Sequence, residues 1–452
     1  MSLKKINNQD LLTMLIEEAK KNGASTADVI YTRNTGINLN YRNNNDETIE
    51  RYDNVDIGLR VFVGKKNAII STNDTSEKKL KEFASKAVEM AKIVPEDNYS
   101  LIASKELLLK YPIDYSTDLE VFDKKEPKID ELRKLAQQME ESALNVSKCI
   151  KSDGSQASWG LTESQLMTSN GFIASNKKTN NTISIIVIGN KSGKMERDYD
   201  FSSKVFFNDL EDPIKLGRNA SEDVIKKLGS KKPKTGKFPI IFNPRVARSI
   251  ATHIASCING SSISRGTSFL KDSFKKKVFS KYINVVDDPL LKRGLGSRLY
   301  DGEGIGVRKT NLVDNGTLKN FLLDISSGIQ LNMETNGNAV RGVNSPPRPG
   351  TTNLIIMPGQ YTQNDLINNI NEGFLITELI GSSISLITGD YSRGASGFWI
   401  KNGKISHPIS EATIAGNLKE MFMQLTPAND LDLSNPIASP SIMLENMVVA
   451  GN

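Results

Sequence analysis

The chain is poor in the residues from which disulfides and metal sites are built. Its 452 residues include only two cysteines and two histidines. Two cysteines cannot form a disulfide framework, and two free thiols fit the reducing cytoplasm, where we expect the protein to reside. Structural zinc sites often show C-x-x-C or H-x-x-x-H spacing, and neither spacing occurs in this sequence.

Long apolar segments are also missing. A membrane-spanning helix needs roughly 18–20 predominantly apolar residues, and no segment of the chain approaches that length. Residues 1–23 contain basic side chains but lack the uninterrupted apolar core of a secretory signal. We therefore expect neither insertion into a membrane nor export.

Positive charge is only mildly in excess. The chain carries 58 lysine and arginine residues against 52 aspartate and glutamate residues, for a net charge of +6. Its densest basic runs, 230–237 and 271–277, look like a linker and a solvated loop or helix. Nucleic-acid-binding proteins usually concentrate basic residues in a patch or stripe, so direct binding of nucleic acid is not expected. The glycine-rich segment 301–309 lacks the spacing of a phosphate-binding loop, which favours a sharply turning loop instead.

Helix and strand periodicities fill the first half of the chain. Apolar and polar residues alternate over 37–41 and 57–63, as in half-buried strands, and Asn170-Gly171 predicts a hairpin turn. These patterns predict an N-terminal α/β region, 1–232, with helices on sheets and two parts at about 1–112 and 113–229. Four segments repeat apolar residues every three or four positions and are predicted to be amphipathic helices: 8–22, 76–94, 127–145 and 213–229.

The second half of the chain differs in texture. It is richer in glycine and in short strands, and Asn315-Gly316 and Asn402-Gly403 predict further hairpin turns. A run with the composition of a linker, 230–236, separates the two halves. We predict a C-terminal domain, 237–452, of largely antiparallel strands with a few helices, and an α+β fold for the whole chain. Helices are fewer here and are predicted over three segments: 243–259, 362–371 and 410–425.

The helix predicted over 243–259 carries one of the two histidines and one of the two cysteines. His253 and Cys257 stand four positions apart, the spacing that places two side chains on one face of a helix. On a helical wheel Cys257 falls inside the apolar arc and His253 at its edge, which favours an ordinary packing role for both. A zinc site needs three or four ligands, and the second histidine, His407, lies far along the chain. A self-sufficient hydrolase that uses Cys257 as its nucleophile stays open as an alternative.

The most unusual segment is "ITGDYSRGASGFWIKNGKI", residues 387–405. It gathers Tyr391, Arg393 and Trp399 around several glycines. The simplest interpretation is a loop followed by a hairpin. The functional alternative is a recognition surface, because Tyr, Arg and Trp commonly anchor interfaces and because loops commonly carry binding residues.

Three stretches of the second half carry a resemblance to a known family. They are 260–273, 301–324 and 378–422, and the last of them contains the segment just quoted. These stretches resemble the TldD/PmbA family, whose members were once called modulators of DNA gyrase and are now described as metalloproteases. The resemblance is specific from about residue 240 to the C-terminus, and it is looser but congruent in order and length before that point.

The resemblance also locates the family's zinc site in this sequence. The TldD branch is known for an H-E-x-x-x-H motif on a helix and for a downstream cysteine that completes the site. The resemblance places Ala251, Thr252 and Ser256 at the three motif positions, and Ala438 and Ser439 where the cysteine would stand. None of these side chains is suited to hold zinc. The chain is thus most similar to the non-metallated PmbA/TldE branch, which implies no catalytic residue and no metal of its own.

The function that the resemblance implies is that of a subunit of a TldD–TldE-type metalloprotease complex. Zinc would lie in a TldD-like partner, and this chain would shape a chamber for unfolded proteins or peptides, such as microcin precursors or an antitoxin. An extended peptide could add a strand to a sheet edge, with Tyr391, Arg393 and Trp399 near that groove or near the subunit interface. By itself the chain could form a homodimer. The competing function is a non-proteolytic regulator that binds DNA gyrase or DNA.

Overall fold

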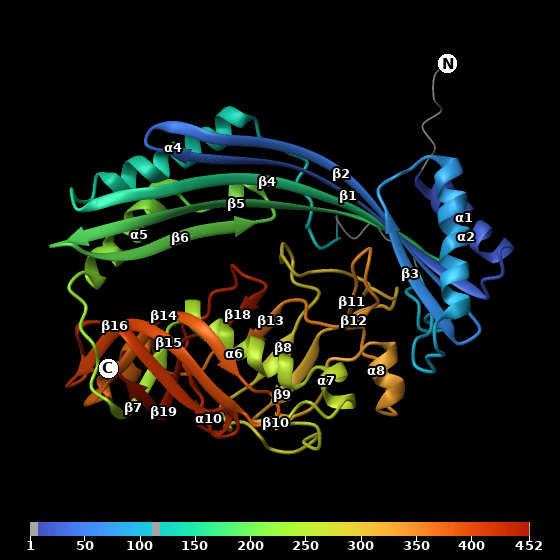
Figure 1. The fold of residues 1–452 in the computed structure, drawn as a ribbon. Coiled ribbons are helices and arrows are strands. Elements are labelled where there is room, and N and C mark those ends of the chain that lie inside the picture. Colours follow the sequence, from blue (N-terminus) through green and yellow to red (C-terminus); the bar gives the residue numbers. More distant parts are fainter. Residues whose placement is uncertain (1–7, 111–117, 452) are drawn as a thin grey trace.

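One antiparallel sheet dominates the first half of the molecule (Figure 1). A computed structural model describes residues 8–110 and 118–451. Strands from both predicted N-terminal parts share the sheet, because β1 pairs with β4 from Asp28–Thr168 to Tyr41–Ser155. The division predicted at 112–113 lies outside the described residues. The strand order is β3-β2-β1-β4-β5-β6, with bounds β1 Thr26–Arg42, β2 Asn45–Val63, β3 Lys66–Thr72, β4 Ile150–Thr168, β5 Ile173–Lys191 and β6 Lys194–Lys204.

Four helices cover one face of this sheet, and all four were expected from their apolar periodicity. Val29 of β1 packs in one core with α1 and α2, and Leu39 of the same strand packs in another core with α4 and α5. Because odd-numbered residues of a strand share a face, the helices lie on one side, and the other side is left for the C-terminal domain. No described helix has both the length and the apolarity that crossing a bilayer requires. The bounds are α1 Asn8–Lys21, α2 Glu77–Ile93, α4 Ile129–Leu144 and α5 Pro213–Lys227.

The C-terminal domain packs two mostly antiparallel sheets around helix α6 (Pro244–Cys257). The first sheet has the order β16-β15-β14-β7-β19-β17, with bounds β7 Gly236–Phe242, β14 Glu372–Ile384, β15 Asp390–Lys401, β16 Lys404–Asn417, β17 Thr426–Pro427 and β19 Ile442–Ala450. The second has the order β10-β9-β8-β13-β18, with bounds β8 Val285–Asp287, β9 Thr310–Asp314, β10 Thr317–Leu318, β13 Leu354–Ile356 and β18 Ile437–Ala438. The remaining elements are η1 Phe207–Asp209, α7 Gly260–Ser264, α8 Ile325–Gln330, β11 Ala339–Val340, β12 Arg348–Pro349, α9 Gln363–Asn368 and α10 Leu418–Gln424. The predicted α+β class is confirmed.

The turns of this domain follow the sequence, but one helix does not. Asn315-Gly316 and Asn402-Gly403 adopt positive φ at all four residues and close the β9–β10 and β15–β16 hairpins, as predicted. The helix predicted over 410–425 is wrong in its first half, because residues 410–417 continue β16 and only 418–424 are helical. Ile414 pairs with Arg393 on one side and with Val449 on the other, so ladder bonds to two strands override the local helical spacing.

A buried ionic cluster joins the two domains. Asp28 lies on the face of β1 turned away from the helices and is 2% exposed. Its carboxylate accepts hydrogen bonds from Arg60 of β2 at 2.5 and 2.9 Å, and Arg341 of the C-terminal domain reaches it at 2.5 Å. Burial raises the pKa of Asp28, but Arg341 and Arg60 outweigh burial and hold it below its ordinary value. The cluster therefore depends on one shared negative charge.

Two further buried acids, Asp301 and Glu303, lie beside this cluster, in the glycine-rich loop that follows Tyr300. Asp301 accepts the backbone N–H groups of Glu303 and Ala339, which fixes the sharp turn expected of the loop. Glu303 accepts the N–H of Ile325, the first residue of α8, at 2.9 Å. Burial, with a further contribution from Asp301, raises the pKa of Glu303 well above its ordinary value.

The pH dependence of stability should therefore change when Glu303 is replaced by glutamine. Because the folded-state pKa is raised, Glu303 favours folding most below the ordinary glutamate pKa, and this contribution is lost as the pH rises through the folded-state pKa. Glu303→Gln keeps an acceptor for the N–H of Ile325 and removes the buried charge. We therefore expect the free energy of unfolding to rise by about 1 kcal/mol at about pH 8 and to change little at about pH 5. Urea unfolding at both pH values measures the effect, with the exposed Glu334→Gln as control. A loss of stability at the higher pH would contradict the prediction.

Candidate functional site

Helix α6 is the element on which the family's zinc motif would stand. It follows β7 directly, and the side chain of Asn243 caps it by accepting the N–H of Val246, with Pro244 as its first residue. Its apolar side is buried in the core between the two sheets, and this side includes Ile250, Ile254 and Cys257. The helix therefore forms for the reasons that its periodicity predicts.

The four positions expected to be degenerate carry no zinc ligand. Ala251 is fully buried in the core. The hydroxyl groups of Thr252, Ser256 and Ser439 donate to main-chain carbonyls at 3.1, 2.9 and 2.9 Å, so each is engaged locally. Helix α6 packs against β18, which ends at Ala438, so the two segments to which the resemblance assigns the site lie side by side. The methyl and hydroxyl groups present do not fit zinc, and the described residues contain no cluster of three His, Cys, Asp or Glu side chains that could hold a metal ion.

His253 and Cys257 occupy the places that the helical wheel predicts. Cys257 is fully buried, and burial raises the pKa of its thiol to about 12. Since the thiolate is the reactive form, this cysteine is poorly suited to act as a nucleophile. His253 is half-buried, and burial together with the positive charge of Arg393 lowers its pKa to about 4. Its ring meets that of Tyr391 edge to face, with 5.8 Å between the centroids.

The three residues singled out on β15 lie in different surroundings. Tyr391 is 2% exposed, and burial raises its pKa to about 12. Trp399 is also buried, at the other end of the strand, with its ring 4.9 Å from that of Phe238. Arg393 alone reaches the surface, and its Nε donates to the carbonyl of Gly381 at 2.7 Å. The structure thus brings Tyr391 and Arg393 together beside α6 and leaves Trp399 apart, and their role at a groove or interface stays a prediction.

The neighbouring strand β14 has a free edge that the sequence did not reveal. β7 pairs with β14 only at residues 374–376 and then gives way to α6. From Thr377 to Ile384, β14 is hydrogen-bonded to β15 alone among the strands that the structure describes. This edge lies beside α6, and it is exposed over residues 380–383, where Ile380 is 58% accessible. An unpaired edge offers main-chain donors and acceptors to an extended chain.

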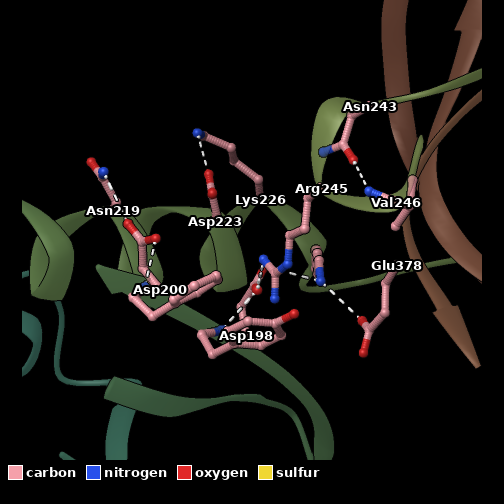
Figure 2. A network of polar contacts seen from close by, with 12 residues as sticks. Asp198, Asp200, Asn219, Asp223, Lys226, Asn243, Arg245, Val246 and Glu378 are labelled. Atoms are coloured by element: carbon pink, nitrogen blue, oxygen red, sulfur yellow. Dashed lines mark hydrogen bonds and ion pairs between the residues drawn. The ribbon is translucent and has the colours of Figure 1, made fainter. Parts of the chain in front are cut away.

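A polar junction ties this edge and α6 to the N-terminal domain (Figure 2). Asp198 of β6 contacts Lys227 of α5 at 3.0 Å and Arg245 of α6 at 2.8 Å. Lys227 also reaches Glu378 of β14 at 3.1 Å. Burial raises the pKa of Asp198, but Lys227 and Arg245 outweigh burial and lower it below the ordinary aspartate value. One buried carboxylate thus fixes the position of α6 relative to the sheet above it.

A cavity of about 510 Å³ opens beside this junction. Its lining includes Arg245, the second histidine His407, and Thr377, where β14 bulges and shifts register against β15. The Thr377 hydroxyl is buried and makes no hydrogen bond to the described residues. Burial lowers the pKa of His407, with further contributions from nearby lysines. The cavity and the free edge together provide polar groups for binding, without a metal ligand set or an activated nucleophile.

Comparisons with known proteins cover the whole chain. Models of the PmbA/TldA metallopeptidases match it in order: domain 1 over 27–91, the central domain over 122–228 and the C-terminal domain over 235–451. The chain is 32% identical to the metalloprotease PmbA homolog of Haemophilus influenzae over 459 residues, covering 100% of this chain and 98% of that protein. It is 30% identical to metalloprotease PmbA of Escherichia coli O157:H7 over 460 residues, covering 100% and 99%.

Solved structures share the fold. A candidate modulator of DNA gyrase from Bacteroides thetaiotaomicron has a TM-score of 0.91 and 26% identity, and the match covers 100% of both chains. TldE from Thermococcus kodakarensis has a TM-score of 0.85 and 21% identity over 98% of this chain and 100% of that one, which shows the same fold. The three domain matches and the full-length identities agree in order and extent. This chain belongs to the PmbA/TldD family of metallopeptidases.

Proposed function

We propose that this chain is the PmbA/TldE-like subunit of a TldD–TldE-type protease, acting in the cytoplasm on unfolded proteins or peptides such as microcin precursors or an antitoxin. The observation that carries the proposal is the set of side chains on α6 at the positions to which the resemblance assigns the zinc motif, because Ala251, Thr252 and Ser256 cannot hold zinc. A TldD-like partner would hold the zinc, which would polarise the scissile carbonyl and activate water. This chain would contribute binding and enclosure.

The free edge of β14 supports a role in holding substrate. A peptide that adds a strand along Thr377–Ile384 would satisfy main-chain donors and acceptors whatever its side chains, which suits a protease of unfolded chains. Arg393 would lie at the rim of that groove, since its guanidinium already bonds to Gly381. Tyr391 and Trp399 would act from beneath, by packing β15 against the core. The cavity beside Thr377 would receive a side chain of the bound peptide.

Mixing the chain with its TldD-like partner and an unfolded peptide tests the proposal. We expect cleavage only when both chains are present, at least about 100-fold faster than with either alone, and its loss on addition of a zinc chelator. Cys257→Ala should leave the rate of the mixture within about twofold, because a thiol with a raised pKa supplies no thiolate. Cleavage by this chain alone that survives the chelator and disappears in Cys257→Ala would instead establish a cysteine hydrolase.

A second candidate function comes from the name of a relative. The Bacteroides structure is described as that of a candidate modulator of DNA gyrase. A regulator of that kind would bind gyrase, or DNA, without cutting peptides. Tight binding of purified gyrase by this chain, together with no cleavage in the two-chain mixture, would favour this function over the protease subunit.

A further inference from the structure

Two short stretches of the chain hold a strong excess of positive charge. In the first, 226–237, four of the six lysines pair with carboxylates, and the second lies in the C-terminal domain. In this second stretch, between positions 265 and 281, stand six basic residues and one acidic residue, for a local net charge of +5. We call this stretch the basic segment. The basic residues of the segment are Arg265, Lys271, Lys275, Lys276, Lys277 and Lys281.

The basic segment is an exposed loop fixed from beneath. Leu270 and Phe279 anchor it in the core, while all six basic residues are exposed. Its backbone bonds to the β9–β10 hairpin: the Lys275 N–H donates to the Leu318 carbonyl at 2.9 Å, and the Leu318 N–H donates to the Lys276 carbonyl at 3.0 Å. The loop lies near β10 and α10, at the end of the C-terminal domain away from the N-terminal sheet (Figure 1). The segment does not line the cavity, but it meets the end of the β14 edge, where the Phe269 N–H donates to the Leu386 carbonyl at 2.8 Å.

The charges of the basic segment have no counterions within the described part of the chain. None of its six basic residues forms an ion pair there, whereas the neighbouring Lys319 pairs with Asp314 at 3.7 Å. Three consecutive lysines, 275–277, repel one another at a cost in stability. A cluster of like charge without internal compensation is the arrangement that complements an anionic partner.

The chemistry of the segment favours carboxylates over nucleic acid. The rings within the segment are packed on the domain: Phe274 lies against Phe321, with 5.5 Å between centroids, and Phe269 and Phe279 lie against Phe422. Rings engaged in this way are not free to stack on nucleotide bases. Five of the six basic residues are lysines, which are point charges without the rigid fork that reads phosphate. A flexible acidic chain needs only such point charges.

We propose that the basic segment is a docking surface for an acidic stretch of polypeptide. Its attraction acts over about a Debye length, so it speeds encounter and weakens with salt. The surface tolerates many sequences, since the number of carboxylates matters more than their order. This inference stands apart from the protease assignment, because it requires neither zinc nor a TldD-like partner.

Binding of a defined acidic peptide tests the inference. The probe is a labelled peptide of repeated Glu-Glu-Gly units, about 15 residues long, titrated with the full chain at about 50 mM salt. The triple variant Lys271→Glu, Lys276→Glu, Lys277→Glu should bind it at least about tenfold more weakly, a loss of about 1.4 kcal/mol or more. The control variant Lys65→Glu, Lys78→Glu, Lys86→Glu makes the same change in net charge at exposed sites in the N-terminal domain. It should stay within about twofold of the natural chain.

Two further measurements keep the outcome decisive. A variant with the same three segment lysines changed to glutamine should lose less affinity for the peptide than the glutamate variant. Thermal unfolding should show that both variants remain folded. No binding of the peptide by the natural chain, or equal losses in the segment and control variants, would overturn the inference. Tighter binding of single-stranded DNA of equal charge, by about tenfold or more, would also overturn it and assign the surface to nucleic acid.

Discussion

Replacing Asp28 by asparagine should lower the free energy of unfolding by about 3–5 kcal/mol. The substitution keeps the shape of the side chain and removes the one negative charge that Arg60 and Arg341 share. Both arginines are buried, with side-chain exposures of 3% and 1%, so water cannot take the place of the carboxylate. The two cations would then face each other across the domain junction without the carboxylate that both of them contact.

Asp53→Asn is the matched control for this prediction. Asp53 pairs with Arg33 across the same two strands, at 2.7 Å, but both side chains are close to half exposed. Exposed pairs contribute little because water solvates the separated charges, so the control should unfold nearly like the natural chain. Urea unfolding followed by circular dichroism measures both variants. Equal losses in the two would show that burial does not set the energy of the Asp28 cluster.

The acid limb of the stability curve gives an independent check on Asp28. Its folded-state pKa is lowered, so its contribution is present above the ordinary aspartate pKa and is lost as the pH falls through the folded-state value. The free energy of unfolding of Asp28→Asn should therefore change less with pH than that of the natural chain in this acidic range. Glu303 acts in the opposite sense, since its raised pKa removes stability as the pH rises.

Replacing Asp198 by alanine should lower the free energy of unfolding by about 2–3 kcal/mol and loosen the attachment of α6 to the N-terminal domain. The loss is smaller than at Asp28 because Lys227 keeps its contact with Glu378 and because Arg245 is 26% exposed. The pKa of Asp198 is lowered, so its contribution also disappears as the pH falls through the folded-state value. Urea unfolding near neutral pH measures the loss.

Limited trypsin digestion reports the local part of the Asp198 effect. The connection between the domains carries Lys231, Lys232 and Lys234, and it is held to β16 through the bond from the Lys231 N–H to the Pro408 carbonyl. Cleavage there should become several-fold faster in Asp198→Ala, because the flanking junction opens more often. Asp223→Ala removes an exposed ion pair with Lys226 on the same helix. It should change neither the free energy of unfolding in urea nor the rate of trypsin cleavage. Faster cleavage in the Asp223 control would contradict this account.

Periodicity predicted most of the elements because helices and tight turns depend on neighbouring residues. Helix α6 shows this well: its apolar stripe, its Asn243 cap and its buried Cys257 all follow from the local spacing. The failure at 410–417 has the opposite cause. There Ile414 sits between two strands that come from other parts of the chain, and the ladder bonds decide its conformation.

The candidate site was only partly accessible from the sequence. The resemblance assigns Ala251 and Ser256 to zinc positions from motif spacing, which is a linear property, and this assignment stays a prediction. The burial of Tyr391 and Trp399 was not foreseen. The sequence predicts both near a groove or the subunit interface, and that role stays a prediction. Their burial follows from the sheet, because β15 lies between β14 and β16 and the inner face of this sheet packs on α6.

The sequence by itself determined the family, the amphipathic helices, the hairpin turns and the charge of the basic segment, since each is written in residues close together along the chain. Only the tertiary structure decided the free edge of β14, the sharing of Asp28 between Arg60 and Arg341, and the junction at Asp198. These features depend on which strands end beside α6 and on which distant side chains are excluded from water together. No local pattern encodes such pairings, because they are set by the packing of two domains.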